Sequence, residues 1–474
     1  MPRIGLVLMV VAALVLATTF VIQAQGPARD PGPRGAPIGA GGYIKDLTAD
    51  QIRFFNNGGT RFNSPDGVEE GLGPTFNGND CGTCHSQPAE GGSSPSMNAF
   101  PNVGPNPQVA LATLNGATNT VPFFVTPDGP VREARFKYMV SNGTMNPNVP
   151  DGGVHDLFTI AGRQDAQGCV YAQPDFNGAQ AQNNLSLRIP TPTFGAGLIE
   201  TIDDATILAN MQANSRAKQV LGISGQPNRS ANDGTITRFG WKAQNKSLLV
   251  FAGEAYNVEV GVSNELMPNK RGNGTTATIP SFCLYTATPN DTTNLLSNAV
   301  AGADDTQVPS DITAFATFMR FLDQPTPACR GKSCSASIQN GRRLFTEVVR
   351  CSLCHSPAMT TGNSSFTPSP DGKSTFGLSF VEAHLFSDLL VHHMGSGLAD
   401  GISQGNAGPD QFRTAPLWGV GQRVFFLHDG RTSDLLQAIQ QHKSPGSEAN
   451  GVISLFNLLT EDQKQDLLNF LRSL

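Results

Sequence analysis

The pattern Cys-x-x-Cys-His occurs twice in the chain, as CGTCH at residues 81–85 and as CSLCH at residues 351–355. It is the attachment pattern of c-type haem, in which both thiols bond the porphyrin and the histidine ligates one face of the iron. The chain's 8 Cys and 8 His, placed at random in 474 residues, would give it about 0.002 times. The alternatives are a redox dithiol or half of a zinc site, but no further Cys or His lies within 60 residues of Cys81. The sequence therefore predicts two covalent haems, held by Cys81, Cys84, His85, Cys351, Cys354 and His355.

The first 24 residues begin with Arg3, run mostly apolar to Ile22 and end in Val-Ile-Gln-Ala. This pattern predicts a secretory signal cleaved after Ala24, with an uncleaved membrane anchor as the alternative. Either way the mature chain lies outside the cytoplasm, in the periplasm or another extracytoplasmic compartment. The net charge of −6 shows no basic stripe, so nucleic acid is not an expected partner.

Four cysteines lie outside the haem motifs: Cys169, Cys283, Cys329 and Cys334. An even number in an oxidising compartment predicts two disulfides, and four cysteines allow three pairings. Short spacing favours Cys329–Cys334, which leaves Cys169 with Cys283. Free buried thiols are the alternative.

Four short stretches of the N-terminal half recur in the same order in the C-terminal half. They are NGGTRF (57–62) with NGRRLF (340–345), PTFGAG (192–197) with PLWGVG (416–421), RFGWK (238–242) with FLHDGR (426–431), and ITAFATFMRFL (312–322) with DQKQDLLNFLRSL (462–474). The last pair predicts an amphipathic helix that closes each half.

This repeat predicts the domain organisation. After the signal peptide, residues 1–24, comes an extended Pro/Gly-rich lead-in, residues 25–43. An N-terminal haem domain with insertions follows at residues 44–325, and a C-terminal haem domain at residues 326–474. The insertions are expected because the second and third repeated stretches lie much farther apart in the N-terminal half.

The stretches GLGPTFNGNDCGTCHSQPAEGG, RFGWKA, FSDLLVHHMGSGLADG and FRTAPLWGVG…FLHDGR resemble the di-haem oxidoreductase (putative peroxidase) family. That family is similar to bacterial di-haem cytochrome c peroxidases and to MauG, and the resemblance runs from about Gly35 to Leu474. It implies a mainly α fold with two cytochrome c-like haem domains and long loops. One haem would react with peroxide while the other stores and relays electrons.

The resemblance also implies two catalytic residues. Trp241 matches a Trp that lies between the haems in the related peroxidases, and its alternative is a plain core Trp. Those peroxidases place a Gln ten residues later, where this chain has Phe251, and then a Glu, which Glu259 matches two residues early. A carboxylate over the iron can take a proton from hydrogen peroxide and return it to the leaving oxygen. The alternative for Glu259 is a solvated carboxylate, and Glu254 and Glu265 are weaker candidates.

The two irons differ in their expected distal ligands. In the N-terminal half His155 is expected to be structural and Met97 is the nearest soft donor, so the first haem is expected to be five-coordinate or closed by water. For the second haem, the resemblance points to the residue fourteen positions after His428, which is His442. Met394 is the second choice, since a thioether is a common cytochrome c ligand.

Arg188 and Arg413 are candidates to neutralise haem propionates, with ordinary surface charge as the alternative. The resemblance implies calcium between the domains, but the matching segment Pro192–Gly195 lacks the side-chain ligand, so calcium stays open.

The leading hypothesis is an exported di-haem oxidoreductase that reduces hydrogen peroxide. Electrons from a small donor, such as a cytochrome or cupredoxin, would pass from the His355 haem by Trp241 to the His85 haem. The alternatives are a MauG-like oxidation of a protein or organic substrate, and a non-enzymatic electron-transfer cytochrome.

Overall fold

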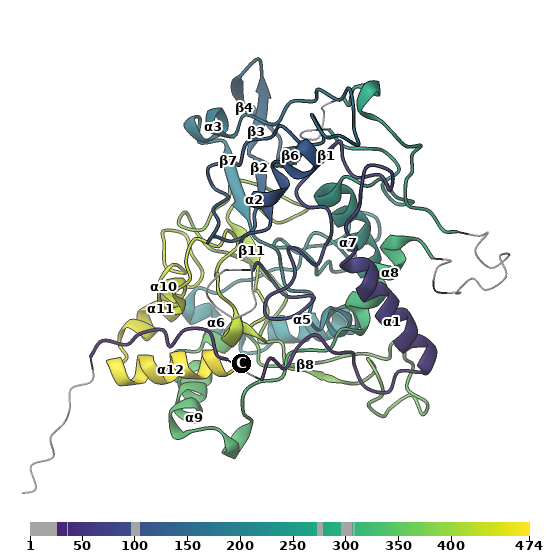
Figure 1. The fold of residues 1–474 in the computed structure, drawn as a ribbon. Helices are drawn as coiled ribbons and strands as arrows, with labels where there is room; N and C mark the ends of the chain where they lie inside the picture. Colours follow the sequence, from purple (N-terminus) through teal and green to yellow (C-terminus); the bar gives the residue numbers. More distant parts are fainter. Residues whose placement is uncertain (1–25, 36, 96–104, 273–277, 295–305, 307–308) are drawn as a thin grey trace, which may run out of the picture.

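The structure is a computed structural model that describes residues 26–35, 37–95, 105–272, 278–294, 306 and 309–474 (Figure 1). The predicted signal peptide, residues 1–24, lies outside these residues. About 30% of the chain is helical and 13% is in strands. The prediction of a mainly α fold therefore holds only in part, because short strands form several small sheets. Within the described residues no helix is long and apolar enough to cross a membrane.

The helices are mostly short. They are α1 (Ala49–Phe62), α2 (Gln108–Leu111), α3 (Phe176–Ala181), α4 (Ala196–Thr201), α5 (Asp204–Gln212), α6 (Ser215–Leu221), α7 (Leu248–Ala255), α8 (Asp311–Phe321), α9 (Ala336–Arg343), α10 (Leu435–Gln440), α11 (Asn450–Asn457) and α12 (Glu461–Ser473). Long irregular segments connect them, as the many Gly and Pro residues predict.

All the strand pairs are antiparallel. The strands are β1 (Thr75–Phe76), β2 (Glu133–Phe136), β3 (Tyr138–Ser141), β4 (Thr144–Pro150), β5 (Val154–His155), β6 (Phe158–Thr159), β7 (Leu185–Arg188), β8 (Met359–Thr360), β9 (Glu382–Ala383), β10 (Val391–His393) and β11 (Gln411–Arg413). The largest sheet has the order β5-β2-β7, and the others are the pairs β1-β6, β3-β4, β8-β9 and β10-β11.

The repeated glycines lie at equivalent close contacts in the two halves. α1 packs against α8, and α9 packs against α12 (Figure 1). A methyl group at Gly58 of α1 would lie 2.6 Å from the Ala314 carbonyl oxygen of α8, and one at Gly341 of α9 would overlap the Asp466 carbonyl oxygen of α12. Only glycine lets the two helix backbones approach this closely.

The second repeated stretch makes a matching contact. A side chain at Gly197 would overlap the Arg320 carbonyl oxygen of α8, and one at Gly421 would overlap the Arg472 carbonyl oxygen of α12. In each half, the last helix thus packs against the Gly-rich segment of the second repeated stretch. The domain boundary near residue 325 stays a prediction.

Two large hydrophobic clusters form the core. One is built mainly from residues 44–322 and the other mainly from residues 344–474. The first cluster also takes in apolar side chains from residues 359–418, so the halves are packed together rather than merely linked. A small third cluster around Trp241 and Phe412 joins them.

The lead-in is extended, and residues 28–34 lie along the C-terminal half (Figure 1). Asp30 accepts from the Arg472 guanidinium at 2.7 and 2.5 Å. The Ala28 amide donates to Glu461, and the Arg34 amide donates to the Gly421 carbonyl oxygen, both at 2.8 Å. The start of the described chain is therefore tied to its last helix.

The structure confirms the favoured disulfides, Cys169–Cys283 and Cys329–Cys334. The first joins residues 114 apart and the second joins residues only 5 apart. The four haem-motif cysteines stay outside disulfides.

Replacing Cys169 and Cys283 by Ser should cost more stability than replacing Cys329 and Cys334 by Ser. A crosslink that closes a longer loop restricts the unfolded chain more, and the difference here is about 2–3 kcal/mol in the chain-entropy model. Urea denaturation of the two double variants measures it. Equal losses would contradict the expectation.

Candidate active site

Each Cys-x-x-Cys-His motif lies in the wall of a cavity. The first cavity is lined by Cys81, Cys84 and His85. The second cavity is lined by Cys351, Cys354 and His355. Trp241 lines both cavities, so the two spaces meet at one side chain.

The two motif histidines have the same arrangement. His85 Nδ1 lies 3.0 Å from the Gly92 carbonyl oxygen, and His355 Nδ1 lies 3.0 Å from the Phe386 carbonyl oxygen. A proton on Nδ1 then leaves Nε2 free to ligate a metal. Burial lowers the pKa of both rings to about 4, so both are neutral at pH 7. A neutral imidazole beside two free thiols fits a thioether-linked haem in each cavity.

An inserted sheet forms part of the wall of the first cavity. Glu133 and Arg135 of β2 point to the same face because side chains alternate along a strand. Arg188 of β7 pairs with Glu133 in the register of the two strands. All three side chains line the first cavity. Neither Glu133 nor Arg135 was predicted from the sequence as a site residue.

Glu259 reaches the same cavity from a π-helical turn, Tyr256–Val260. Its carbonyl oxygen accepts from the amides of Asn77 at 2.7 Å and Gly78 at 3.1 Å, which fixes the turn against the segment before the first haem motif. The carboxyl of Glu259 lies close enough to that of Glu133 for each to act on the pKa of the other. Such π-helical turns are frequent at functional sites.

The weaker carboxylate candidates have other partners. Glu254 lines the first cavity, but it accepts from the side-chain amide of Asn245. Glu265 accepts from Thr293 and does not line the cavity. Of the three predicted acids, Glu259 is therefore the one whose carboxyl lies beside another acid, Glu133, in the first cavity.

The two acids of this pair differ in pKa. Burial raises the pKa of Glu259 well above its usual value, and the neighbouring Glu133 raises it further. Burial also acts on Glu133, but Arg135 and Arg188 hold the pKa of Glu133 below its usual value. Glu259 is therefore the acid of the pair that keeps a proton more readily.

His155 is not a ligand of the first site in this structure. Its Nε2 lies 2.9 Å from Asp151, and its ring stacks on Phe136 at 3.7 Å between centroids. Met97 lies outside the described residues. Among the described residues that line the first cavity, His85 is the only histidine, and Met319 is a thioether that the sequence analysis did not consider.

The second cavity offers several donors for a second ligand, since His392, Met394, His428 and His442 all line it. His442 resembles the motif histidines, because its Nδ1 lies 2.8 Å from the Ala438 carbonyl oxygen and its Nε2 has no partner among the described residues. His428 instead stacks on Phe412 at 4.4 Å between ring centroids.

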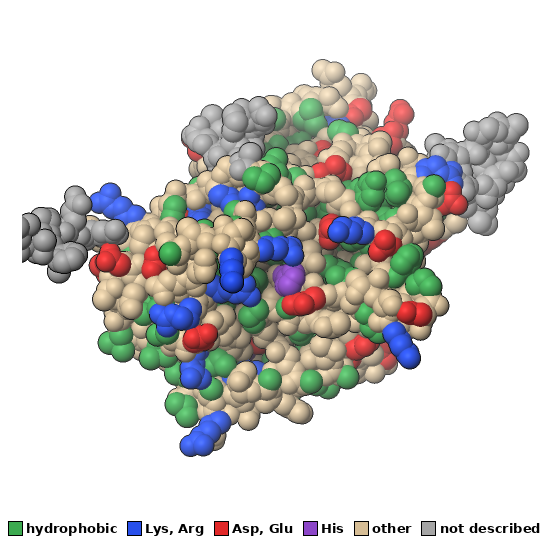
Figure 2. Space-filling model, turned by 90° about the horizontal axis from the view of Figure 1, so that it is seen from below, with side chains coloured by type: hydrophobic (Ala, Val, Ile, Leu, Met, Phe, Trp, Pro, Cys, Tyr) green, Lys and Arg blue, Asp and Glu red, His purple; other side chains and the backbone are tan. Residues whose placement is uncertain are grey.

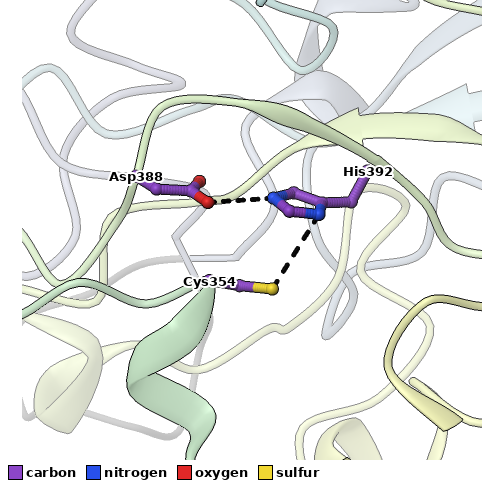
Figure 3. A group of neighbouring side chains, drawn as sticks. All are labelled: Cys354, Asp388 and His392. Atoms are coloured by element: carbon purple, nitrogen blue, oxygen red, sulfur yellow. Dashed lines mark hydrogen bonds and ion pairs between the residues drawn. The ribbon is translucent and has the colours of Figure 1, made fainter. Parts of the chain in front are cut away.

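Figure 3 shows His392 with Asp388 and Cys354, whose ligand atoms lie within 4.8 Å of one another. The ring is held on both sides, with Nε2 3.0 Å from Asp388 and Nδ1 2.8 Å from Glu448. No ring nitrogen is left for a metal, and Cys354 belongs to the haem motif. The neighbouring Cys354 sulfur and the Asp388 carboxylate raise the pKa of His392 well above its usual value despite burial.

Trp241 is fixed between the cavities. Its Nε1–H donates to the Ile189 carbonyl oxygen at 2.8 Å, and its ring meets His428 edge-on at 6.4 Å between centroids. An indole in contact with both cavities is suited to electron transfer, although that role stays a prediction.

A buried ion cluster adjoins Trp241. Asp400 lies 2.6 Å from Arg188 and 3.0 Å from the Lys242 ammonium, and all three side chains are at most 3% exposed. Asp400 belongs to the C-terminal half and the two cations to the N-terminal half. Lys242 is therefore part of the contact between the halves.

The predicted propionate partners differ from each other. Arg188 donates hydrogen bonds to Asp400 and Gln404, so fewer of its N–H groups remain for a propionate than expected. Arg413 and Arg423 both line the second cavity, and neither has a carboxylate partner among the described residues. Burial lowers the pKa of both to about 10. Arg423 was not predicted from the sequence.

Comparison with known proteins agrees with this geometry. The model of the family described as "Di-haem oxidoreductase, putative peroxidase" matches residues 155–474. The chain therefore belongs to this family, and membership implies haem cofactors. No curated protein matches the chain.

Three solved structures show partial similarity. Hydrazine synthase of Kuenenia stuttgartiensis is 17% identical, with 36% of this chain and 56% of that chain covered and a TM-score of 0.22. A MauG-like protein associated with microbial copper homeostasis is 19% identical, with 38% of this chain and 60% of that chain covered and a TM-score of 0.22. The diheme peroxidase BthA from Burkholderia thailandensis E264 is 13% identical, with 60% of this chain and 86% of that chain covered and a TM-score of 0.27. The chain spans less than two thirds of the length of the first two.

Proposed function

We propose that the chain is an exported di-haem c-type oxidoreductase that reduces hydrogen peroxide. The difference between the cavities carries this proposal. The first cavity combines Glu259 with a single described histidine, whereas the second offers the free Nε2 of His442 opposite several other donors. The His85 haem is thus the reactive one, and the His355 haem relays electrons.

Each residue of the proposed site has its own role. A bound haem supplies the redox chemistry at an open iron face. His85 and His355 hold the irons, and Glu259 exchanges protons with peroxide in the first cavity. Trp241 separates the two cavities and shortens the gap between the haems. Calcium has no further support and is not assigned a role.

The electron donor is proposed to dock near the second haem. Figure 2 shows the face around α9 and α12, where Lys and Arg side chains gather beside a histidine. Exposed cations of this region include Arg330, Lys332, Arg342 and Arg343. They lie 8 to 21 residues before Cys351 in the chain, and their positive charge suits a small acidic cytochrome or cupredoxin.

Stopped-flow mixing of the semi-reduced protein with hydrogen peroxide tests the proposal. We expect a change in the Soret band and turnover with a small redox protein as donor. Ferric electron paramagnetic resonance should show one high-spin and one low-spin haem. Two low-spin signals and no reaction with peroxide would favour an electron carrier. Haem that stays on the chain in a denaturing gel tests covalent attachment, and cell fractionation tests export.

His442→Ala should convert the second haem from low-spin to high-spin and let it bind cyanide. The reason is that Nε2 of His442 is the free donor in the second cavity. Electron paramagnetic resonance of the ferric protein measures the change.

Met394→Leu is the matched control for that variant. Met394 lines the same cavity, and its replacement should leave the second haem low-spin. The reverse result, a high-spin signal only in Met394→Leu, would assign the ligand to the thioether.

A further inference from the structure

We propose that Glu133 is a second catalytic residue and that Glu133 and Glu259 handle the protons of peroxide together as one carboxyl pair. The inference rests on the proposed function and deepens it. The two residues are 126 positions apart in the chain and meet in the first cavity, one from β2 and one from the π-helical turn. Their carboxyls lie close enough to interact directly.

Arg135 holds the pair in place. Its Nε lies 2.7 Å from Glu133 Oε1, and its other end donates to the Gly152 carbonyl oxygen at 3.0 Å. Arg135 is only 8% exposed, so this ion pair is strong and keeps Glu133 ionised. The proton of the pair consequently lies on Glu259.

A protonated acid cannot serve as a base, so Glu259 alone cannot take a proton from peroxide. With Glu133 beside it, Glu259 can accept that proton while its own proton moves to Glu133. Two carboxyls this close share protons as a unit rather than singly. The pair then goes from one proton to two.

The step balances in atoms and charge. One O–H bond of peroxide breaks and its proton enters the pair. The O–O bond then breaks with its electron pair on the outer oxygen, which takes the proton back from Glu259 and leaves as water. The inner oxygen leaves as the second water once it has received the donor's two electrons and two solvent protons. Over the whole reaction, one hydrogen peroxide, two electrons from the donor and two solvent protons give two waters. The pair ends with one proton, as it began.

Two variants of Glu133 test the proposal in the haem-loaded protein. Glu133→Gln keeps the size of the side chain but cannot accept a proton, and the rate constant with peroxide should fall about 100-fold. Glu133→Asp keeps the charge beside Arg135 but withdraws the carboxyl, and about a tenfold loss is expected. Glu265→Gln, which lies outside the first cavity and accepts from Thr293, is the matched control and should react at the wild-type rate.

Infrared spectroscopy gives a readout that needs no turnover. The wild-type protein at neutral pH should show the C=O band of a buried protonated carboxyl, sensitive to deuterium. Glu259→Gln should abolish this band, and Glu133→Gln should shift it. A wild-type rate in both Glu133 variants, or a band that neither substitution changes, would overturn the proposal. A wild-type protein that is inert to peroxide refutes the proposed function, while the infrared result still decides whether the pair exists.

Discussion

Glu259→Gln is expected to lower the rate constant for reaction with hydrogen peroxide by 10²–10⁴-fold, the usual contribution of a positioned acid or base. The amide keeps the shape of the side chain but can no longer carry the exchangeable proton. Haem content and the ferric spin states should stay unchanged, because the His85 ring is held by the Gly92 carbonyl oxygen and not by Glu259. Stopped-flow absorbance against peroxide concentration measures the loss.

Glu265→Gln is the matched control for that variant. Glu265 lies six residues farther along the chain and accepts from Thr293 outside the first cavity. Its replacement should leave the peroxide rate constant unchanged. If both variants react like the wild type, proton exchange at Glu259 is not part of the reaction.

Asp400→Ala should lower the free energy of unfolding by about 3–5 kcal/mol, because it leaves two buried cations without their partner. Those cations are Arg188 and Lys242, which lie 2.6 and 3.0 Å from the carboxylate. They hold the pKa of Asp400 below its usual value in spite of burial. The stabilisation is therefore present at neutral pH and is lost only in acid, as the pH falls through that lowered pKa.

The urea midpoint of the haem-loaded protein checks this expectation. Asp50→Ala serves as control, since Asp50 pairs with Arg53 at an 80% exposed position. Exposed pairs contribute little, so its midpoint should hardly move. A loss in Asp400→Ala no larger than in the control would mean that water compensates the two cations.

Local patterns in the sequence predicted the parts of the molecule that depend on local chemistry. The two haem motifs, the short disulfide and the Gly residues of the repeats are read from neighbouring residues. The sheet content was underestimated, because strands of two to four residues such as β2 and β7 are too short to show a period.

The acid pair could not be predicted from either of its members alone. Glu133 lies in an inserted strand, and nothing in VREARF indicates that it meets a turn 126 residues later. The alternating charges of Glu133 and Arg135 were the one available signal. Arg188 shows the same limit, since its charge was evident but its partner Asp400 lies 212 residues away.

The ion pair between Asp30 and Arg472 has a practical consequence. The earliest described residues pack against the last helix, so the two ends of the described chain lie in contact. A fragment cut at residue 326 to isolate the second haem would lack residues 28–34 and would leave Arg472 facing solvent without its carboxylate. Such a fragment should therefore be made with residues 28–34 joined to it.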